Sequence, residues 1–276
     1  MSTQDIPTLY NFWQWILGDK GKPFVSEEKG VRSLSFSMMA VQSSMRLSNP
    51  YELKLSYTQT MMGFLLFNDD PRHILIVGLG GGSLSKYCYQ QFPQTKITTL
   101  EISAEVIALR DEFLIPPDDE RFQVIHTDAA DYLANNDIRA DIIMLDGFDT
   151  DGLPDCLSSI LFYTNCWRAL GAHGILVSNL LGCNQPVSVY LQRLHMLFND
   201  QVWRSKALDS SNMIAFALKN NDYSPHWPGL LKKAEALAER YQLNFSRIVK
   251  NMRKHQLQVQ PSIETFNLYD MGEAQD

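Results

Sequence analysis

The strongest constraint on the fold is a series of short apolar runs separated by stretches with helical spacing. Runs this short and this apolar are typical of strands that are buried on both faces. Their alternation with helical stretches predicts a parallel sheet covered by helices. The five runs occupy residues 73–77, 96–100, 122–126, 141–145 and 174–178.

Two further apolar runs, 201–208 and 213–218, are separated by only four residues. Parallel neighbours need a crossover of about a dozen residues or more, so these two runs predict an antiparallel hairpin. A dinucleotide-binding sheet normally ends with parallel strands. Five parallel strands followed by a hairpin therefore predict an α/β fold. It is the Rossmann-like seven-stranded sheet of class I transferases that use S-adenosylmethionine (AdoMet).

The chain divides into three zones by pattern. Residues 1–70 open with an aromatic patch, for which we expect a packing or subunit-contact role, and then alternate with period two over 31–38 and 40–46. This predicts a short helix and a small β-rich domain, followed by helical spacing over 55–67. Residues 71–220 form the predicted nucleoside-binding domain. Residues 221–276 predict a helical extension, with helices near 230–238 and 247–254. The aromatic patch consists of Tyr10, Phe12, Trp13 and Trp15.

Composition and charge restrict the classes of partner that this chain can bind. With 24 basic and 31 acidic residues the net charge is −7, which disfavours nucleic acid and permits cationic small molecules. The apolar runs are far shorter than the ~20 residues of a membrane helix. The amino-terminal residues carry no export signal, so we expect a cytoplasmic protein without a membrane partner. Four cysteines without a CxxC pair predict buried, reduced thiols and no metal site.

A glycine-rich loop follows the first predicted strand. Gly78, Gly80 and Gly82 lie in the segment Gly78-Leu79-Gly80-Gly81-Gly82-Ser83. Glycine allows the backbone to turn tightly and to approach a ligand closely. The loop alone could equally serve a tight strand-to-helix turn.

Acidic residues follow the next three predicted strands. Glu101 stands 21 residues after Gly80, the spacing expected of a carboxylate that binds ribose hydroxyls. Asp128 and Asp146 follow the third and fourth strands. Because open α/β sheets bind ligands beyond the carboxyl ends of their strands, the loop and the acids should share one crevice. Asp128 could instead cap the next helix. An NAD enzyme would use the loop and Glu101 similarly, but the later acids and the hairpin argue against it.

These motifs resemble the spermidine synthase family of aminopropyltransferases, and the resemblance spans residues 25–220. It implies a small N-terminal β domain on a Rossmann-like domain, a homodimer, and transfer of an aminopropyl group from decarboxylated AdoMet to a polyamine, with methylthioadenosine released. The residues that carry it are 76–83, Leu100-Glu101-Ile102, Thr127-Asp128-Ala129, Leu145-Asp146-Gly147-Phe148-Asp149, Gln42 and 56–61.

The resemblance also implies roles for individual residues. Asp146 would receive the amine proton, and Asp149 would be a second carboxylate facing the polyamine. Tyr57 would orient the attacking nitrogen, and Gln42 would line the same pocket. Asp128, followed by Ala129, would accept the adenine amino group. Such acids suit the reaction, because an alkyl amine with a pKa of about 10.4 must lose a proton before it attacks. Asp149 could instead cap a loop, and Tyr57 could pack under the sheet.

Two departures from the family pattern leave alternatives open. The family places an aspartate where this chain has Gly81, and that aspartate meets the free amino group of the donor. The loop after the fourth strand also differs, with Gly147, Phe148 and Thr150 in place of its usual residues. The alternatives are an AdoMet-dependent methyltransferase and a non-catalytic nucleoside-binding relative.

Overall fold

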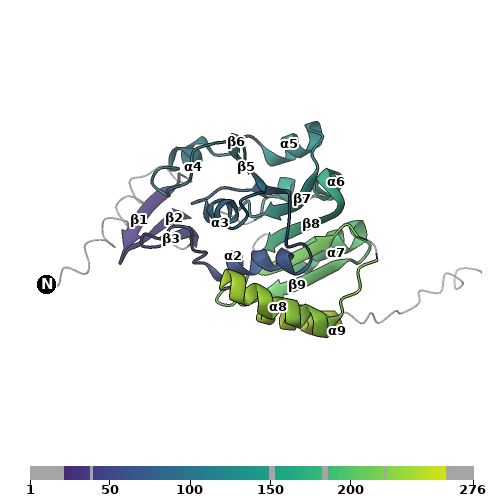
Figure 1. The fold of residues 1–276 in the computed structure, drawn as a ribbon. Coiled ribbons are helices and arrows are strands. Elements are labelled where there is room, and N and C mark those ends of the chain that lie inside the picture. The colour runs from purple at the N-terminus through teal and green to yellow at the C-terminus, as the bar shows by residue number, and fades with distance from the viewer. Residues whose placement is uncertain (1–21, 38–39, 149–152, 182–185, 221, 259–276) are drawn as a thin grey trace, which may run out of the picture.

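The computed structural model describes residues 22–37, 40–148, 153–181, 186–220 and 222–258 of the 276-residue chain. These residues form a large sheet covered by helices and a smaller sheet beside it (Figure 1). The predicted aromatic patch and short first helix lie outside the described residues, as do Asp149 and Cys183.

The large sheet has seven strands in the order β6-β5-β4-β7-β8-β10-β9. The strands from β6 to β8 are parallel, and β10 runs antiparallel to both of its neighbours. The predicted seven-stranded sheet with its terminal hairpin is therefore confirmed. In chain order the strands are β4 (His73–Val77), β5 (Lys96–Glu101), β6 (Phe122–His126), β7 (Ala140–Leu145), β8 (Leu170–Leu180), β9 (Val202–Lys206) and β10 (Met213–Leu218).

Helices cover both faces of this sheet because its strands are apolar on both sides. Along β4, Ile74 and Ile76 belong to one core cluster, and Leu75 and Val77 to the other. The first face is covered by α3 (Ser83–Gln91), α4 (Ala104–Ala108), α8 (Trp227–Tyr241) and α9 (Phe245–Gln258), and the second by α5 (Ala129–Asn135), α6 (Ile160–Ala169) and α7 (Val187–Leu197). The result is three layers.

The small sheet is an antiparallel meander of three strands, which are β1 (Phe24–Glu28), β2 (Val31–Ser37) and β3 (Ala40–Arg46). The two alternating segments predicted from the sequence pair as β2 and β3, with a register shift after Leu34. Leu34 and Met45 are buried in the same core as α3. This contact fixes the small sheet next to the loop that precedes α3.

The segment between the two sheets is mostly buried, with Ser56, Tyr57 and Gln59 half-buried. It comprises α2 (Ser56–Met61) and the 3-10 helix η1 (Met62–Leu66). Helices α8 and α9 both pack on η1, and α9 also packs on β9, so the two predicted C-terminal helices join the core of the large sheet. The division at residues 70 and 220 stays a prediction.

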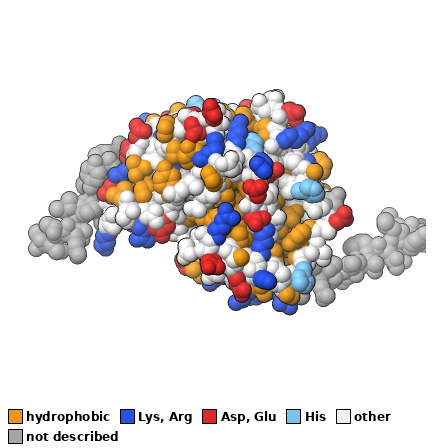
Figure 2. All heavy atoms as spheres, in the orientation of Figure 1, with side chains coloured by type: hydrophobic (Ala, Val, Ile, Leu, Met, Phe, Trp, Pro, Cys, Tyr) orange, Lys and Arg blue, Asp and Glu red, His pale blue; other side chains and the backbone are white. Residues whose placement is uncertain are grey.

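The surface and the cysteines complete the description. Figure 2 shows basic and acidic side chains interspersed over the visible face. Within the described ranges, no helix is long and apolar enough to cross a bilayer. Cys88 and Cys166 are buried free thiols, as expected, but Cys156 is exposed. The expectation was wrong for Cys156 because it lies in η2 (Asp155–Leu157), a short 3-10 turn without a buried residue.

Candidate active site

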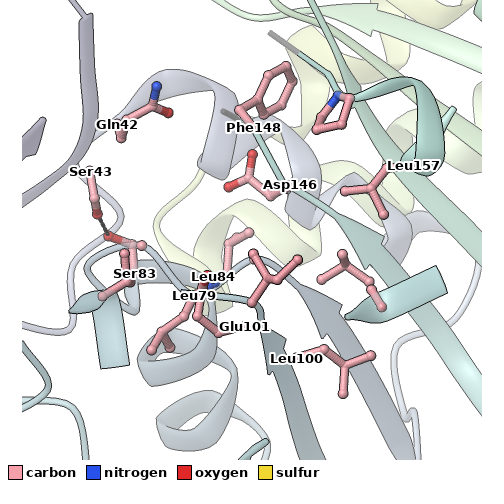
Figure 3. A pocket seen from close by; sticks show the side chains of 18 of the residues that line it. Gln42, Ser43, Leu79, Ser83, Leu84, Leu100, Glu101, Asp146, Phe148 and Leu157 are labelled. Carbon is pink, nitrogen blue, oxygen red and sulfur yellow. Dashed lines mark hydrogen bonds between the residues drawn. The ribbon is translucent and has the colours of Figure 1, made fainter. Parts of the chain in front are cut away.

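A pocket opens at the carboxyl ends of β4, β5, β6 and β7, where the sequence predicts it. Residues from β3 and α2 close it on the side of the small sheet. Figure 3 shows Gln42 and Ser43 facing it from β3, with Asp146 and Phe148 on another side and Glu101 deeper along the loop. Of the predicted site residues, those that line the pocket are Gln42, Tyr57, Gly78, Gly80, Glu101, Asp128, Ala129 and Asp146.

The glycine loop needs glycine at the predicted positions. Gly78, Gly80 and Gly82 all have positive φ, at 94°, 51° and 67°. A Cβ on Gly78 would lie 2.5 Å from the carbonyl oxygen of Asp146, and one on Gly82 would lie 2.6 Å from Ile115. Gly82 is the N-cap of α3, and its own N–H donates to the carbonyl oxygen of Leu79 at 2.8 Å, which closes the turn between β4 and α3.

Gly81 is packed for a different reason. A Cβ there would lie 2.7 Å from the ring of Phe113 and 2.7 Å from Oγ of Ser43. The hydroxyls of Ser43 and Ser83 lie 3.2 Å apart beside it. Two neighbours therefore occupy the space that an aspartate side chain would need.

Glu101 joins the glycine loop to the start of α4. Its Oε2 accepts the Leu79 N–H at 2.8 Å and its Oε1 accepts the Ser103 N–H at 2.9 Å. The side chain is 8% exposed and lines the pocket. These two backbone bonds fix the carboxylate at the position expected for a ribose ligand.

Asp128 is the N-cap of α5, which was the alternative role expected for it from the sequence. Its Oδ1 accepts N–H groups of Ala130 at 2.6 Å and Asp131 at 3.2 Å. Oδ2 takes part in neither bond, and the residue lines the pocket next to Ala129. Capping and ligand binding are therefore compatible here.

Asp146 lies at the end of β7, partly accessible from the pocket and otherwise enclosed by protein. Desolvation raises the pKa of its carboxyl from 3.8 to about 7. Two donors act against this rise: Asn179 Nδ2 donates to Oδ1 at 2.8 Å, and the Tyr57 hydroxyl donates to Oδ2 at 3.2 Å. Such a carboxyl can exchange a proton near neutral pH.

Tyr57 links Asp146 to the small sheet. Its hydroxyl is also 3.3 Å from the carbonyl oxygen of Gln42, so one proton can be directed to either acceptor. Desolvation and the nearby Asp146 raise the Tyr57 pKa well above 10. The hydroxyl therefore stays protonated and serves as a donor.

Sequence reasoning missed Asn179, which is 1% exposed and bonded directly to Asp146. The available signal was a polar residue at the carboxyl end of the fifth parallel strand, next to Ser178. It also missed Ser43 and Ser83, which lie on β3 and at the start of α3 and meet only in three dimensions. Among the described residues, no three His, Cys, Asp or Glu side chains form a group suited to a metal ion.

The sheet order, the glycine loop and the acids at the strand ends together define a class I AdoMet-type transferase fold. Comparison with known proteins identifies the family within this class. The spermine/spermidine synthase domain matches residues 54–198. The chain is 35% identical to the polyamine aminopropyltransferase of Chromobacterium violaceum over 231 residues, which cover 83% of this chain and 88% of that protein. This chain therefore belongs to the spermine/spermidine synthase family.

Solved structures share the fold. A probable spermidine synthase from Corynebacterium glutamicum superposes with a TM-score of 0.64 at 19% identity, over 77% of this chain and 83% of that one. Human methyltransferase-like protein 13 in complex with SAH gives a TM-score of 0.62 at 22% identity, over 68% and 92%. The predicted transferase class and the resemblance to spermidine synthases are confirmed.

Proposed function

We propose that this chain transfers an aminopropyl group from decarboxylated AdoMet to a polyamine. One observation carries the proposal: the pocket is lined by three carboxylates, Glu101, Asp128 and Asp146, and its described lining holds no Lys, Arg or His. Decarboxylated AdoMet bears a sulfonium and an ammonium, and a polyamine is also cationic. An anionic pocket lets two cations approach each other.

The donor would lie across the carboxyl ends of the strands. Gly78 and Gly80 place no side chain between the loop and the donor, and Gly82 permits the turn into α3. Glu101 accepts the ribose hydroxyls, and Asp128 with Ala129 borders the adenine. The sulfonium end then faces Asp146 and Gln42. The contacts of Glu101 with Leu79 and Ser103 support this assignment, because they orient the carboxylate before the ligand arrives.

Asp146 would act on the acceptor. Its carboxylate binds the amine, with Tyr57 holding the second oxygen, and takes a proton as the nitrogen attacks the carbon next to sulfur. The new C–N bond forms as the C–S bond breaks, and the bonding electrons leave on sulfur as the neutral thioether methylthioadenosine. A pKa of about 7 suits this exchange. Asp149, proposed as a second acid, lies outside the described residues.

A second candidate is methyl transfer from intact AdoMet, and Gly81 favours it. The family aspartate that would meet the donor amino group is replaced by glycine, packed against Phe113 and Ser43. No acid at this position then repels the carboxylate of intact AdoMet. The anionic lining opposes this candidate.

Ligand binding and turnover separate the two candidates. Melting temperatures are measured with decarboxylated AdoMet, AdoMet and methylthioadenosine, since a ligand at 100 times its Kd stabilises the fold by about 2.7 kcal/mol. Decarboxylated AdoMet with putrescine or spermidine should then yield methylthioadenosine. Stabilisation by AdoMet alone would favour the methyltransferase. Stabilisation by methylthioadenosine without turnover would favour a non-catalytic nucleoside-binding protein.

We also propose a homodimer, supported by the family resemblance and tested by light scattering on the purified chain. A single-chain mass at assay concentration would reject it. The cytoplasmic location stays a prediction.

A further inference from the structure

Two asparagine side chains form a relay that ends on Asp146. Asn212 Nδ2 donates to Asn179 Oδ1 at 2.9 Å, and Asn179 Nδ2 donates to Asp146 Oδ1 at 2.8 Å. Neither asparagine belongs to the described pocket lining, so the relay approaches Asp146 from within the protein. It reaches only the oxygen that Tyr57 does not contact.

The backbone fixes both ends of the relay. Asn179 lies on β8 opposite Ile214 of β10, and Asn212 immediately precedes β10. The carbonyl oxygen of Asn212 accepts the Ala207 N–H at 3.0 Å, and its own N–H donates to Ser210 Oγ at 3.4 Å. The turn between β9 and β10 therefore presents Asn212 in one orientation.

The order of donors gives the relay a direction. A carboxamide has one acceptor oxygen and one donor nitrogen, and Asn212 occupies the oxygen of Asn179. Only the nitrogen of Asn179 then remains to face Asp146. A donor at this position stabilises a carboxylate, whereas the reversed amide would place oxygen against oxygen unless Asp146 were protonated.

Around Asp146 the described side chains offer no cation that could do this work. The other titratable side chains that line the pocket with Asp146 come from α2, η2, β5 and the start of α5; they are Tyr57, Cys156, Glu101 and Asp128. All of these are neutral or acidic. Hydrogen-bond donors must therefore stabilise the Asp146 charge.

We propose that Asn212, acting through Asn179, is a positioning residue that favours the ionised, proton-accepting form of Asp146. Asp146 is then ready to take the amine proton, and its second oxygen stays available to Tyr57 and the pocket. The statement that this relay supports catalysis rests on the proposed function. Its effect on Asp146 does not, because the contacts exist without any ligand.

The test reverses the relay with a nearly isosteric change. In Asn212→Asp the new carboxylate accepts from Asn179 Nδ2 and turns Asn179 Oδ1 toward Asp146. Asn212→Leu removes the donor without adding charge. Ser211→Asp is the matched control, because it adds the same charge one residue away at an exposed position.

The first readout is the pKa of Asp146, measured by carbon NMR on ligand-free protein with labelled aspartate carboxyls and assigned with Asp146→Asn. A hydrogen bond to a charged group corresponds to about one to two pKa units. We expect Asn212→Asp to raise the pKa by that amount and Asn212→Leu to raise it by less. Ser211→Asp should change it by only about 0.3 units.

The second readout is the pH profile of kcat with decarboxylated AdoMet and putrescine. Its acidic limb should move upward by the same amount as the NMR titration, with little change in the donor KM.

An unchanged Asp146 titration in Asn212→Asp, or an equal shift in Ser211→Asp, overturns the inference. Should Asn212→Asp not fold, Asn212→Leu decides alone. If the variants show the expected NMR shifts but the wild-type chain shows no turnover, the proposed function is rejected and the relay is retained.

Discussion

Asp146 and Lys86 are both ionisable side chains removed from bulk water, but they lie in different surroundings. Lys86, on α3, is 0% exposed, and its ammonium donates to the Phe113 carbonyl oxygen at 2.6 Å and to Met45 Sδ at 3.0 Å. Burial lowers its pKa from 10.5 to about 8. Asp146 shows the opposite shift from the same cause, but it opens onto the pocket.

A shifted pKa alone therefore does not distinguish a reactive group from a structural one. The distinguishing features are access and partners. Lys86 is enclosed by β3 and the segment after α4, and its partners there are neutral atoms. Asp146 accepts a hydrogen bond from Asn179 on the protein side and lines the pocket on the other. We expect substitution at Asp146 to affect turnover and substitution at Lys86 to affect stability.

The largest effect should come from Asp146→Asn. Loss of the proton acceptor should lower kcat with decarboxylated AdoMet and putrescine by about 10²–10⁴-fold, the usual contribution of a general base. Methylthioadenosine release measures it. The fold should not weaken at pH 8, because the change removes a desolvated charge. Retention of more than about a tenth of wild-type kcat would assign the proton transfer to another group.

The same variant should change the pH dependence of stability. The Asp146 pKa is about 7 in the folded chain and near 3.8 when unfolded, so the folded state binds more protons between these values. The Asp146 contribution to the free energy of unfolding therefore falls as pH rises from about 4 to 7. Urea unfolding at several pH values should show this contribution in the wild type and not in Asp146→Asn.

Lys86→Met should stabilise the fold and leave turnover intact. The shift from 10.5 to about 8 corresponds to about 3 kcal/mol of unfavourable desolvation at neutral pH. The lost bond to Phe113 offsets about 1 kcal/mol of the gain. Because the folded lysine loses its proton first, the wild type gains stability as pH rises from about 8 to 10.5, and the two chains converge there.

Urea unfolding across this pH range tests the prediction, with Lys250→Met as the control because Lys250 is exposed on α9. A control with the same pH dependence would assign the effect to surface charge. A large loss of kcat in Lys86→Met would instead show that Lys86 supports the site through Phe113 and Gly81.

The sequence predicted those parts of the molecule that local pattern determines. Apolar runs identified the strands of the large sheet, and the acids at the carboxyl ends of β5, β6 and β7 identified the pocket. Lys86 could not be found in this way, because a lysine in a short helix is normally solvated and here tertiary contacts with Met45 of β3 and with Phe113 enclose it. Asn179 carries no charge, and its function depends on Asn212, 33 positions away along the chain. Tertiary contacts determine both the burial of Lys86 and the role of Asn179.

Gly81→Asp tests the contact between the pocket around Asp146 and the buried surroundings of Lys86. Phe113 contacts Gly81 with its ring and Lys86 with its carbonyl oxygen, so a new side chain at position 81 must displace it or Ser43. Overpacking of this kind costs about 1–3 kcal/mol. We expect a lower melting temperature and weaker binding of decarboxylated AdoMet, measured by thermal shift and calorimetry.

The double variant Gly81→Asp with Ser43→Gly removes one of the two obstacles. It should recover part of the lost stability, and an acid in the pocket should then favour decarboxylated over intact AdoMet. Tighter donor binding in Gly81→Asp alone would mean that Phe113 yields easily and that the packing does not exclude the aspartate.

Tyr57→Phe should have the smallest effect, because the hydroxyl contributes one of two donors to Asp146 and its bond is the longer one, at 3.2 Å against 2.8 Å. Its removal raises the Asp146 pKa and lowers kcat at pH 7 by about threefold to tenfold, with recovery at pH 9 where the carboxyl is ionised. Tyr87→Phe is the matched control: Tyr87 is 5% exposed on α3 and its hydroxyl contacts the Tyr241 carbonyl oxygen. The pH profile of kcat should stay unchanged in that control. A loss in Tyr57→Phe that is equal at pH 7 and pH 9 would show that Tyr57 orients the acceptor and does not tune Asp146.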